Sequence, residues 1–182
     1  VMEDRQLFRS SRAEGLPTLC DRLLSLFDAM ADRGVLPDHA SAHAARMRDD
    51  AQDDTAKAAA GVFADSADAY GEYCRRRWER GRLCFADFVL LPILGMTQRP
   101  TLRAMVRGEC AAFVVDEFQD CNAGQIELLR LLAGDGGAAG GDTGPDICVV
   151  GDDDQAIYAF RGADERAFER FTRIWPGAAV VE

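Results

Sequence analysis

Two short apolar segments, each followed by a polar loop, constrain the fold of this chain more than any other feature. Residues 112–115 (Ala-Phe-Val-Val) and 147–150 (Ile-Cys-Val-Val) are uninterrupted apolar runs. Such runs are typical of strands that are buried on both faces of a parallel sheet. A helical pattern follows each run, so the order is strand, helix, strand, helix. This order predicts right-handed crossovers and an α/β sheet.

Helical spacing and cap residues define the two helices that follow the apolar runs. Asn122, with Gln125 three residues later, predicts a capping box at the start of the first helix. The buried stripe of that helix is predicted to be Ile126, Leu129 and Leu132. Three aromatic residues share one face of the last helix, which Pro176 and Gly177 end: Phe168, Phe171 and Trp175. The segment between Gly134 and Pro145 has no apolar pattern and predicts a surface connection.

The sequence before the first apolar run also predicts helices. Four apolar residues recur at helical spacing, at Leu19, Leu23, Leu26 and Met30. Thr18 is a candidate N-cap for this helix, and Gly34 follows its end. Asp38 is a candidate cap for an Ala-rich helical stretch over residues 39–73. Residues 83–91 form a dense apolar segment, which predicts a helix packed on the sheet.

Composition restricts the class of protein. The net charge of −10 argues against a protein that coats nucleic acid by charge alone, but it does not exclude a local basic groove. One basic cluster, residues 74–82, either contacts phosphates or forms a solvated helix face whose arginines pair with acids. The six cysteines include no C-x-x-C pair, which favours free thiols in a reducing compartment over a zinc site. No apolar run is long enough for a membrane span, and no signal peptide is recognised.

The residues that carry chemistry follow the first predicted strand. Asp116 and Glu117 stand at its carboxyl end, where α/β sheets place ligand-binding groups. Phosphoryl transfer needs a divalent metal that neutralises phosphate charge and a group that orients or deprotonates the attacking water. Adjacent carboxylates that point in different directions can divide these tasks. The alternative interpretation is an acidic turn without a ligand.

A second polar loop follows the second predicted strand, and Gly151 permits the turn into it. Gln155 is a neutral donor and acceptor that can contact a terminal phosphate. Tyr158 and Phe160 offer flat faces on which bases can stack. Arg161 is a fixed positive fork suited to a phosphate or a carboxylate. Aromatic residues are more often part of a core, but this polar, glycine-flanked loop favours exposure.

These two segments carry a resemblance to a known family. DEFQD at residues 116–120 and GDDDQAIYAFRGA at residues 151–163 resemble motifs II and III of superfamily 1 DNA helicases of the UvrD/Rep/PcrA type. Residues 83–88 resemble the family segment LDFDDL, although Cys84 and Ala86 replace acids there, which weakens any role beyond packing. Residues 131–135 resemble the end of a family helix. The resemblance is specific over about residues 70–182.

The resemblance implies a fold and a division into domains. Residues 83–182 would be the C-terminal part of the first RecA-like lobe, a partial P-loop NTPase lobe with a parallel sheet and helices. Residues 1–82 would be an all-helical accessory subdomain, although residues 1–69 fit the family only by position. The loop between Gly134 and Asp146 is longer than usual and is interpreted as a surface insertion. The overall class is α/β with an N-terminal helical subdomain.

The resemblance also implies roles for the nucleotide site. Asp116 would hold the Mg²⁺ that is bound to ATP, and Glu117 would activate the attacking water. Gln155 would sense the terminal phosphate and connect it with the DNA site. Arg161 would pair with the acidic motif or approach the phosphate. Asp152 and Asp154 are interpreted as residues that order the loop.

On the DNA side, Tyr158 and Phe160 would contact unstacked bases of a single strand. The family usually has Trp at the position of Phe160, so stacking persists with less area. The implied partners are single-stranded DNA or 3′-tailed duplex DNA, with 3′-to-5′ movement, and the remaining helicase lobes. The implied location is intracellular, in a bacterial cytoplasm or a eukaryotic nucleus, and DNA repair is an implied role. The residues themselves specify neither polarity nor oligomeric state.

One element of such a motor is absent from the sequence. The phosphate-binding loop G-x-x-x-x-G-K-[ST] does not occur, because no Gly-Lys pair exists and Lys57, the only lysine, has no suitable glycines near it. Both ends read as cuts through a longer protein. The sequence therefore predicts a fragment of an ATP-dependent DNA helicase that, by itself, neither hydrolyses ATP appreciably nor unwinds DNA.

Three alternatives stay open. The chain can be a truncated, non-catalytic motor lobe that serves as a binding module, which the missing Gly-Lys loop favours. It can come from the motor of a helicase–nuclease. It can also belong to another P-loop ATPase that does not use DNA, although the aromatic residues of the second loop argue against this.

Overall fold

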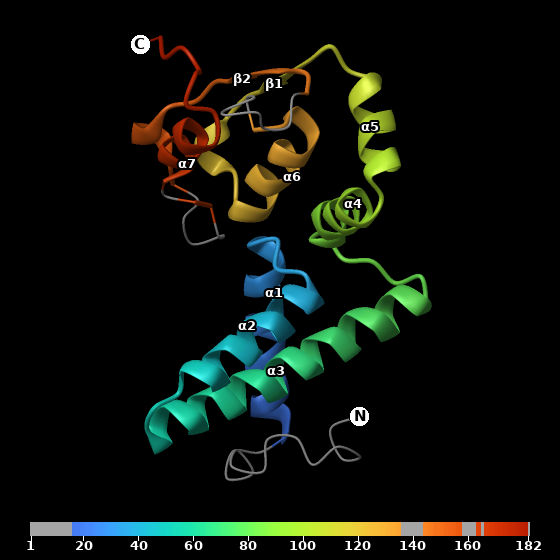
Figure 1. The fold of residues 1–182 in the computed structure, drawn as a ribbon, viewed down its shortest axis with the longest axis vertical. Coiled ribbons are helices and arrows are strands. Elements are labelled where there is room, and N and C mark those ends of the chain that lie inside the picture. Colours follow the sequence, from blue (N-terminus) through green and yellow to red (C-terminus); the bar gives the residue numbers. More distant parts are fainter. Residues whose placement is uncertain (1–15, 136–143, 158–162, 165, 182) are drawn as a thin grey trace. The chain divides into compact units, whose positions relative to one another are not determined.

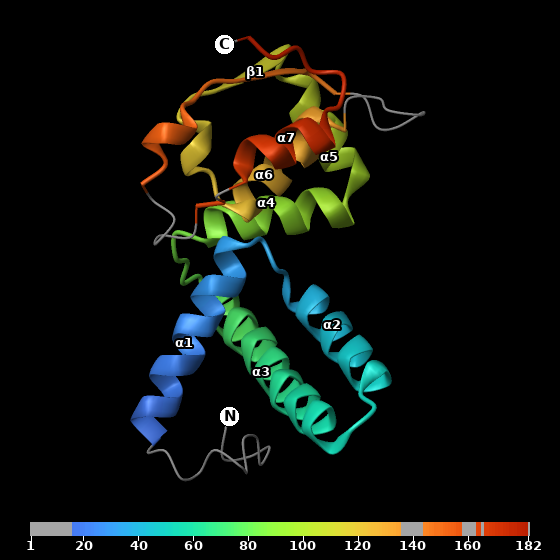
Figure 2. The same cartoon turned by 90° about the vertical axis from the view of Figure 1, so that its left-hand side faces the viewer.

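The computed structural model describes residues 16–135, 144–157, 163–164 and 166–181. The chain forms two compact units, drawn in Figures 1 and 2. The first unit comprises residues 1–30 and 35–85, and the second comprises residues 31–34 and 86–182. Among the helices of the described residues, none is long and apolar enough to cross a membrane.

The first unit is helical. It contains α1 (Leu16–Asp32), whose last two residues belong to the second unit, α2 (Pro37–Asp50) and α3 (Asp54–Glu79). Helices α2 and α3 pack side by side, as both views show (Figures 1 and 2). Residues from all three helices form one core, which includes Leu23, Phe27, Ala40, Tyr70 and Cys74.

The Ala-rich stretch predicted as one helix over residues 39–73 is two helices. They are separated at residues 51–53, because the Asp53 side chain accepts a hydrogen bond from the Ala56 N–H (2.7 Å) and caps α3. The predicted cap Asp38 lies in the first turn of α2, since the helix begins at Pro37, whose fixed φ suits a first helical position.

The ends of α1 agree only in part with the prediction. Thr18 lies inside α1 and is not its cap, because the helix already begins at Leu16. Gly34 follows the helix with a φ of +68°, a left-handed conformation that favours glycine.

The second unit combines helices with a small sheet. Its helices are α4 (Asp87–Gln98), α5 (Pro100–Gly108), α6 (Ala123–Ala133) and α7 (Ala167–Ile174). The strands β1 (Ala112–Val115) and β2 (Asp146–Val149) are parallel, with Ala112 opposite Asp146 and Val115 opposite Val149. Two short 3₁₀ helices, η2 (Phe118–Asp120) and η4 (Asp153–Gln155), follow the strands. The predicted class, α/β with a helical subdomain, is confirmed.

Among the described residues, helices cover the sheet on one face only. Phe113, Val115 and Val149 are half-buried against a core that also contains residues of α6 and α7, and both views place these helices on the same side of the strands (Figures 1 and 2). On the other face Val114 is 76% exposed and Cys148 is exposed. The prediction that both faces of the strands are buried was therefore wrong for the described residues. Side chains alternate between the two faces of a strand, and only the side chains on one face contact the helices.

Around the sheet, most predicted helices are present with shifted bounds. The capping box at α6 is confirmed. In α6, Leu131 is buried and Leu132 only half-buried, because this helix packs on α4 and α5 as well as on α7. Phe171 of α7 and Trp175, directly after this helix, are buried, as predicted.

The segment predicted as a helix over residues 83–91 differs more. The helix begins only at Asp87, and its packing partners are α5 and α6. Leu83, Phe85 and Phe88 are exposed, Phe85 by 93%. The apolar composition of this segment therefore reflects burial only in part, since Leu90 is fully buried.

Candidate functional site

The two sequence motifs lie side by side at the carboxyl ends of the two strands. Hydrogen bonding continues past the sheet, since the Val150 N–H donates to the Val115 carbonyl (2.8 Å). The Phe118 N–H in turn donates to the Val150 carbonyl (2.9 Å). The parallel register therefore brings the segment that begins at Asp116 next to the loop that begins at Gly151.

Phe118 anchors the acidic motif in the core. Its ring is fully buried and makes edge-on contacts with Phe168 (centroids 5.4 Å apart) and Phe171 (5.6 Å) of the α7 region. The neighbouring carboxylates, Asp116 and Glu117, are exposed. The motif is thus held by its aromatic residue, while Asp116 and Glu117 face outward.

Glu117 has an unusual backbone conformation. Its φ of 52° and ψ of 43° lie in the left-handed region, and it is the one non-glycine residue with positive φ among those described. Such a conformation costs about 1 kcal/mol or more and concentrates at functional sites. The Glu117 N–H donates to Asp116 Oδ1 (2.9 Å). The turn therefore fixes both carboxylates at the strand end.

A buried glutamine connects the two motifs. Gln119 is 3% exposed, and its amide uses both ends. Its Nε2 donates to Glu117 Oε2 (2.7 Å), and its Oε1 accepts from the Asp152 N–H (3.1 Å). Sequence analysis gave this residue no role. The available signal was a neutral amide inside an acidic motif, because an amide can donate to a carboxylate and accept from a backbone N–H at once.

Asp152 extends the connection to Gln155. Asp152 Oδ1 accepts from the Asp154 N–H (3.0 Å), which caps η4. Asp152 Oδ2 accepts from Gln155 Nε2 (2.7 Å). A continuous path of hydrogen bonds and short covalent links thus runs from the Glu117 carboxylate through Gln119 and Asp152 to the Gln155 amide.

Gly151 makes room for this arrangement. A Cβ atom at this position would overlap Gln119 Oε1 and would approach the Phe118 nitrogen (3.0 Å) and Phe168 Cζ (3.1 Å). Its φ is not positive, so the requirement here is for space and not for a left-handed backbone.

The far end of the second motif also returns to the first. The Asp164 N–H donates to the Cys121 carbonyl (2.9 Å), and Ala163 forms an antiparallel bridge with Asn122. The loop is therefore bonded to the acidic motif at its start, and to Cys121 and Asn122 just after that motif at its end. The predicted DNA-contacting residues Tyr158 and Phe160, and the predicted Arg161, lie outside the described residues.

The carboxylates fit a magnesium–nucleotide ligand better than a self-contained metal site. Carboxylate oxygens suit Mg²⁺, which usually takes one or two of them together with water and substrate phosphates. The described residues contain no group of three or more side chains placed to hold a metal ion. Asp116 and Glu117 each use one oxygen in the bonds given above, so a second oxygen on each side chain can contact a ligand.

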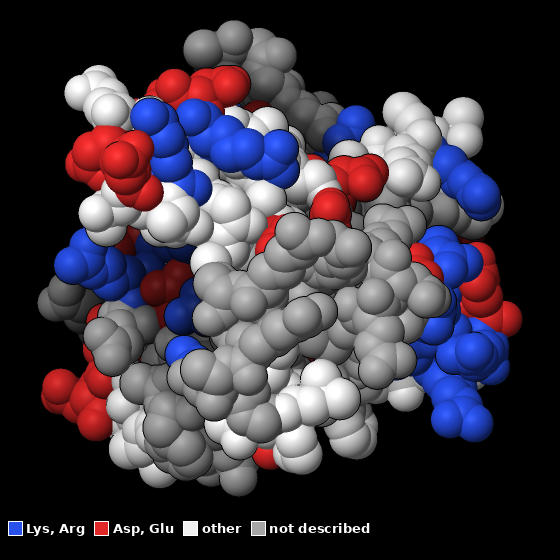
Figure 3. Space-filling model, turned by 90° about the horizontal axis from the view of Figure 1, so that it is seen from below, with Lys and Arg blue, Asp and Glu red and all other residues white. Residues whose placement is uncertain are grey.

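The basic cluster at the end of α3 contains two arginines that are paired with acids. Arg75 forms ion pairs with Glu72 (2.8 Å) and Glu79 (2.6 Å), and Arg76 pairs with Glu72 (2.7 Å). Hydrogen bonds from Arg75 and then Arg76 lower the pKa of Glu72 to about 2. Basic side chains lie beside acidic ones at the edges of the face drawn in Figure 3. The paired interpretation therefore holds for Arg75 and Arg76.

Fold and site together define a chain with an α/β unit, which carries polar side chains at the carboxyl ends of two parallel strands, and a helical unit. The sequence model of the UvrD/REP helicase N-terminal domain matches residues 7–176. The chain therefore belongs to the UvrD/REP helicase family.

Curated relatives agree with this membership. ATP-dependent DNA helicase UvrD1 of Mycobacterium tuberculosis is 37% identical over 129 residues, which cover 71% of this chain and 16% of the relative. DNA helicase II of Escherichia coli is 37% identical over 113 residues (62% and 14%). ATP-dependent DNA helicase Rep of Salmonella typhimurium is 33% identical over 131 residues (70% and 18%). The chain thus spans about a sixth of the length of these relatives.

Proposed function

We propose that this chain is part of the motor of an ATP-dependent DNA helicase, in which residues 83–182 belong to the first RecA-like lobe and residues 1–82 to a helical accessory subdomain. The observation that carries the proposal is the hydrogen-bonded path from Glu117 through Gln119 and Asp152 to Gln155. A motor must transmit the state of its nucleotide to its DNA site, and this path joins the two segments that would do so. The relatives named as ATP-dependent DNA helicases support the same activity.

In this mechanism Asp116 would hold the magnesium ion of Mg–ATP, and the ion would neutralise charge at the phosphates. Glu117 accepts the proton of the attacking water at its carboxylate. Gln119 keeps that carboxylate oriented, because its amide is buried and cannot rotate without losing two hydrogen bonds. Gln155 contacts the terminal phosphate. Its hydrogen bond to Asp152 connects it with the acidic motif, so both segments respond to the state of the nucleotide.

The DNA-binding part of the proposal concerns residues between the two bonded ends of the second motif. Tyr158 and Phe160 stack on unpaired bases of single-stranded DNA or of a 3′-tailed duplex, with movement in the 3′-to-5′ direction. Arg161 pairs with the acidic motif or contacts phosphate. One support for the pairing is that Asp120 Oδ1 is enclosed and has no hydrogen-bond partner among the described residues.

A non-catalytic role of the chain by itself is the second candidate, and the missing Gly-Lys loop favours it. We therefore assign catalysis to the whole protein, which acts inside the cell on DNA, for example in repair. The 182-residue chain is proposed to be inactive without the phosphate-binding loop and the second lobe.

ATP hydrolysis by the full-length protein tests the proposal. Addition of single-stranded DNA should stimulate hydrolysis, and Glu117→Gln should abolish it while ATP binding persists. Glu127→Gln, a partly exposed glutamate on α6, is the matched control and should leave hydrolysis intact. Single-strand affinity and DNA-stimulated ATP hydrolysis that both stay unaltered when Tyr158→Ala and Phe160→Ala are introduced would instead favour an ATPase without a DNA substrate.

A further inference from the structure

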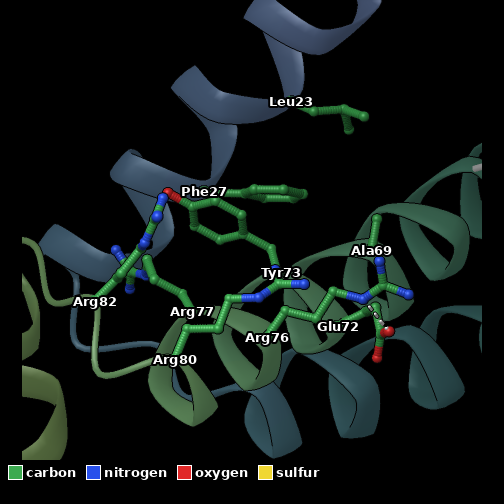
Figure 4. Close-up of a pocket in the computed structure, with 9 residues that line it drawn as sticks. All are labelled: Leu23, Phe27, Ala69, Glu72, Tyr73, Arg76, Arg77, Arg80 and Arg82. Atoms are coloured by element: carbon green, nitrogen blue, oxygen red, sulfur yellow. Dashed lines mark hydrogen bonds and ion pairs between the residues drawn. The ribbon is translucent and has the colours of Figure 1, made fainter. Parts of the chain in front are cut away.

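A cavity of about 440 Å³ opens in the helical unit, between α1 and the last turns of α3 (Figure 4). Its apolar floor comes from both helices, with Leu23, Phe27, Ala69 and Tyr73. Leu23 and Phe27 are buried core residues, whereas Ala69 and Tyr73 are half-buried and keep part of their surface open. The cavity can therefore receive one apolar side chain against Ala69 and Tyr73, with the core residues behind them as support.

The aromatic rings of the floor are already covered by other side chains. Phe27 is 5% exposed, and its ring lies 5.3 Å from the ring centroids of both Tyr70 and Tyr73. The Arg77 guanidinium lies over the Tyr73 ring, 4.8 Å from its centroid. A flat ligand such as a base finds no free ring face to stack on, so the floor suits a compact aliphatic group.

The rim of this cavity is basic. It carries one carboxylate and four arginines: Glu72, Arg76, Arg77, Arg80 and Arg82. The Glu72 carboxylate is already matched, because it accepts hydrogen bonds from Arg75 (2.8 Å) and Arg76 (2.7 Å). The rim therefore has an excess of positive charge, although the chain as a whole has a net charge of −10. Its complement is a ligand that carries negative charge around an apolar group.

Carboxylates are the anions that arginines at this helix end hold in the structure. Arg75 lies between two glutamates, and its Nη1 donates to both carboxylate oxygens of Glu79 (2.6 and 2.7 Å). By contrast, Arg80 and Arg82 are exposed, and their side chains take part in no ion pair among the residues that the structure describes. These two guanidinium groups are therefore open to carboxylates from another molecule.

An ordered turn places these two arginines. Arg80 is the C-cap of α3, and Gly81 follows with a φ of +62°. The Gly81 N–H donates to the Trp78 carbonyl (2.9 Å), and the Arg82 N–H donates to the Arg77 carbonyl (2.9 Å). These bonds close the helix and fix the backbone from which Arg80 and Arg82 extend to the cavity. Figure 4 shows the two aromatic rings at the centre, with arginine side chains beside them.

We propose that this cavity docks an acidic segment of a partner protein, in which one aliphatic side chain stands between carboxylates. Arg80 and Arg82 pair with the carboxylates, and the aliphatic side chain contacts Ala69 and Tyr73. A guanidinium fork matches a carboxylate with two parallel hydrogen bonds. Charge complementarity and the covered rings favour this partner over nucleic acid, which would bring phosphates but leave the apolar floor without a contact. None of these residues belongs to the two motifs, so the inference does not depend on ATP hydrolysis.

Fluorescence anisotropy with the 182-residue chain tests the charge contacts, and the probe is a labelled peptide in which one leucine stands between two pairs of glutamates. Loss of one exposed ion pair weakens an interaction by up to about fivefold. The pair Arg80→Gln and Arg82→Gln should therefore weaken binding by about five- to 25-fold. The control pair Arg46→Gln and Arg48→Gln removes the same charge from exposed positions on α2 and should leave the affinity unchanged. Equal losses in both pairs would overturn the inference.

A second peptide, with serine in place of leucine, tests the apolar contact on the unsubstituted chain. It should bind about four- to tenfold more weakly, because a half-buried leucine gains about half of the free energy of full burial. Ala69→Leu fills the floor and should remove this difference between the peptides. Ala58→Leu adds the same volume at an exposed position of α3 and should preserve the difference. Equal affinities of the two peptides for the unsubstituted chain would overturn docking in the cavity.

Competition separates an acidic peptide from nucleic acid. The unlabelled leucine peptide should displace the probe, and a peptide with lysines in place of the glutamates should not. Displacement by oligothymidylate that is as effective as displacement by the peptide would assign the rim to phosphates and overturn the inference. Failure of the full-length protein to hydrolyse ATP would leave all of these results unaffected, so the two proposals fail separately.

Discussion

At the scale of single residues, the site depends on side chains that combine two contacts. Gln119 is the clearest case, because a carboxylate there would repel Glu117 and a hydroxyl would not span the distance to Asp152. Glu117 is the opposite case, since a residue with a Cβ atom occupies a backbone region that suits glycine. The two residues together hold the Glu117 carboxylate in a fixed orientation on a strained backbone.

Glu117→Gly and Glu117→Ala measure this strain. Both variants lose the carboxylate and its hydrogen bond with Gln119, but only glycine relieves the left-handed backbone. We expect Glu117→Gly to be more stable than Glu117→Ala by about 1 kcal/mol in urea-induced unfolding. Equal stabilities would mean that Glu117 does not have a positive φ in solution.

Gly151→Ala tests the close approach of the two motifs. The added methyl group overlaps Gln119 Oε1 and crowds Phe118, and overpacking of this kind costs about 1–3 kcal/mol. Chemical denaturation should show this loss. Gly61→Ala is the control, because its Cβ meets no atom within 4 Å and it lies inside α3, where alanine is favoured over glycine by about 1 kcal/mol. A stable Gly151→Ala variant would contradict the packing around Gln119.

At the scale of elements, sequence patterns predicted the features that depend on residues close together in the sequence. The four-residue apolar run gave the bounds of β1 correctly, and the Asn122–Gln125 pair gave the start of α6, because both features depend on neighbours in sequence. The exposure of Val114 and Phe85 was not predictable, since it depends on which elements pack against each face. The path through Gln119 was missed for the same reason, because Gln119 and Asp152 are 33 residues apart in the sequence.

The capping box of α6 supports the acidic motif, because the helix begins directly after η2. Asn122 Oδ1 accepts from the Gln125 N–H (2.9 Å), and Gln125 Oε1 accepts from the Asn122 N–H (2.9 Å). Asn122→Ala should therefore lower the free energy of unfolding by about 1 kcal/mol. Gln98→Ala, at the last residue of α4, is a matched control that should have little effect. Thermal unfolding of both variants gives the comparison.

The end of α3 should show a pH-dependent contribution to stability. The pKa of Glu72 is lowered from 4.5 to about 2 by hydrogen bonds from Arg75 and Arg76. A lowered pKa in the folded state means that the stabilisation is present above about pH 4.5 and disappears as the pH falls towards 2. Glu72→Gln should therefore lower Tm slightly at pH 7, since the pairs are solvent-exposed, and the difference should vanish near pH 2. A difference that is constant with pH would contradict the ion pairs.

At the scale of the whole molecule, the two units carry different parts of a proposed nucleic-acid motor. The helical unit has its own core and a basic cavity, and the α/β unit has its own core and the connected motifs. The sequence predicted this division into a helical part and an α/β part, and the family membership, because motif residues are contiguous. It did not predict the cavity, whose walls come from α1 and α3, more than 40 residues apart at Phe27 and Tyr73.

The strand ends also set a limit on what the chain can do alone. Glu117 and Asp116 face outward beside the acidic start of η4, so ATP would bring its phosphate charges to a region that is itself negative. Such a site needs a phosphate cradle of backbone N–H groups and a lysine before its carboxylates can act. We therefore expect the purified 182-residue chain, with Mg²⁺ and ATP, to release less than one phosphate per chain in a malachite-green assay. Stoichiometric release that Glu117→Gln abolishes would show that other residues of this chain bind the phosphates.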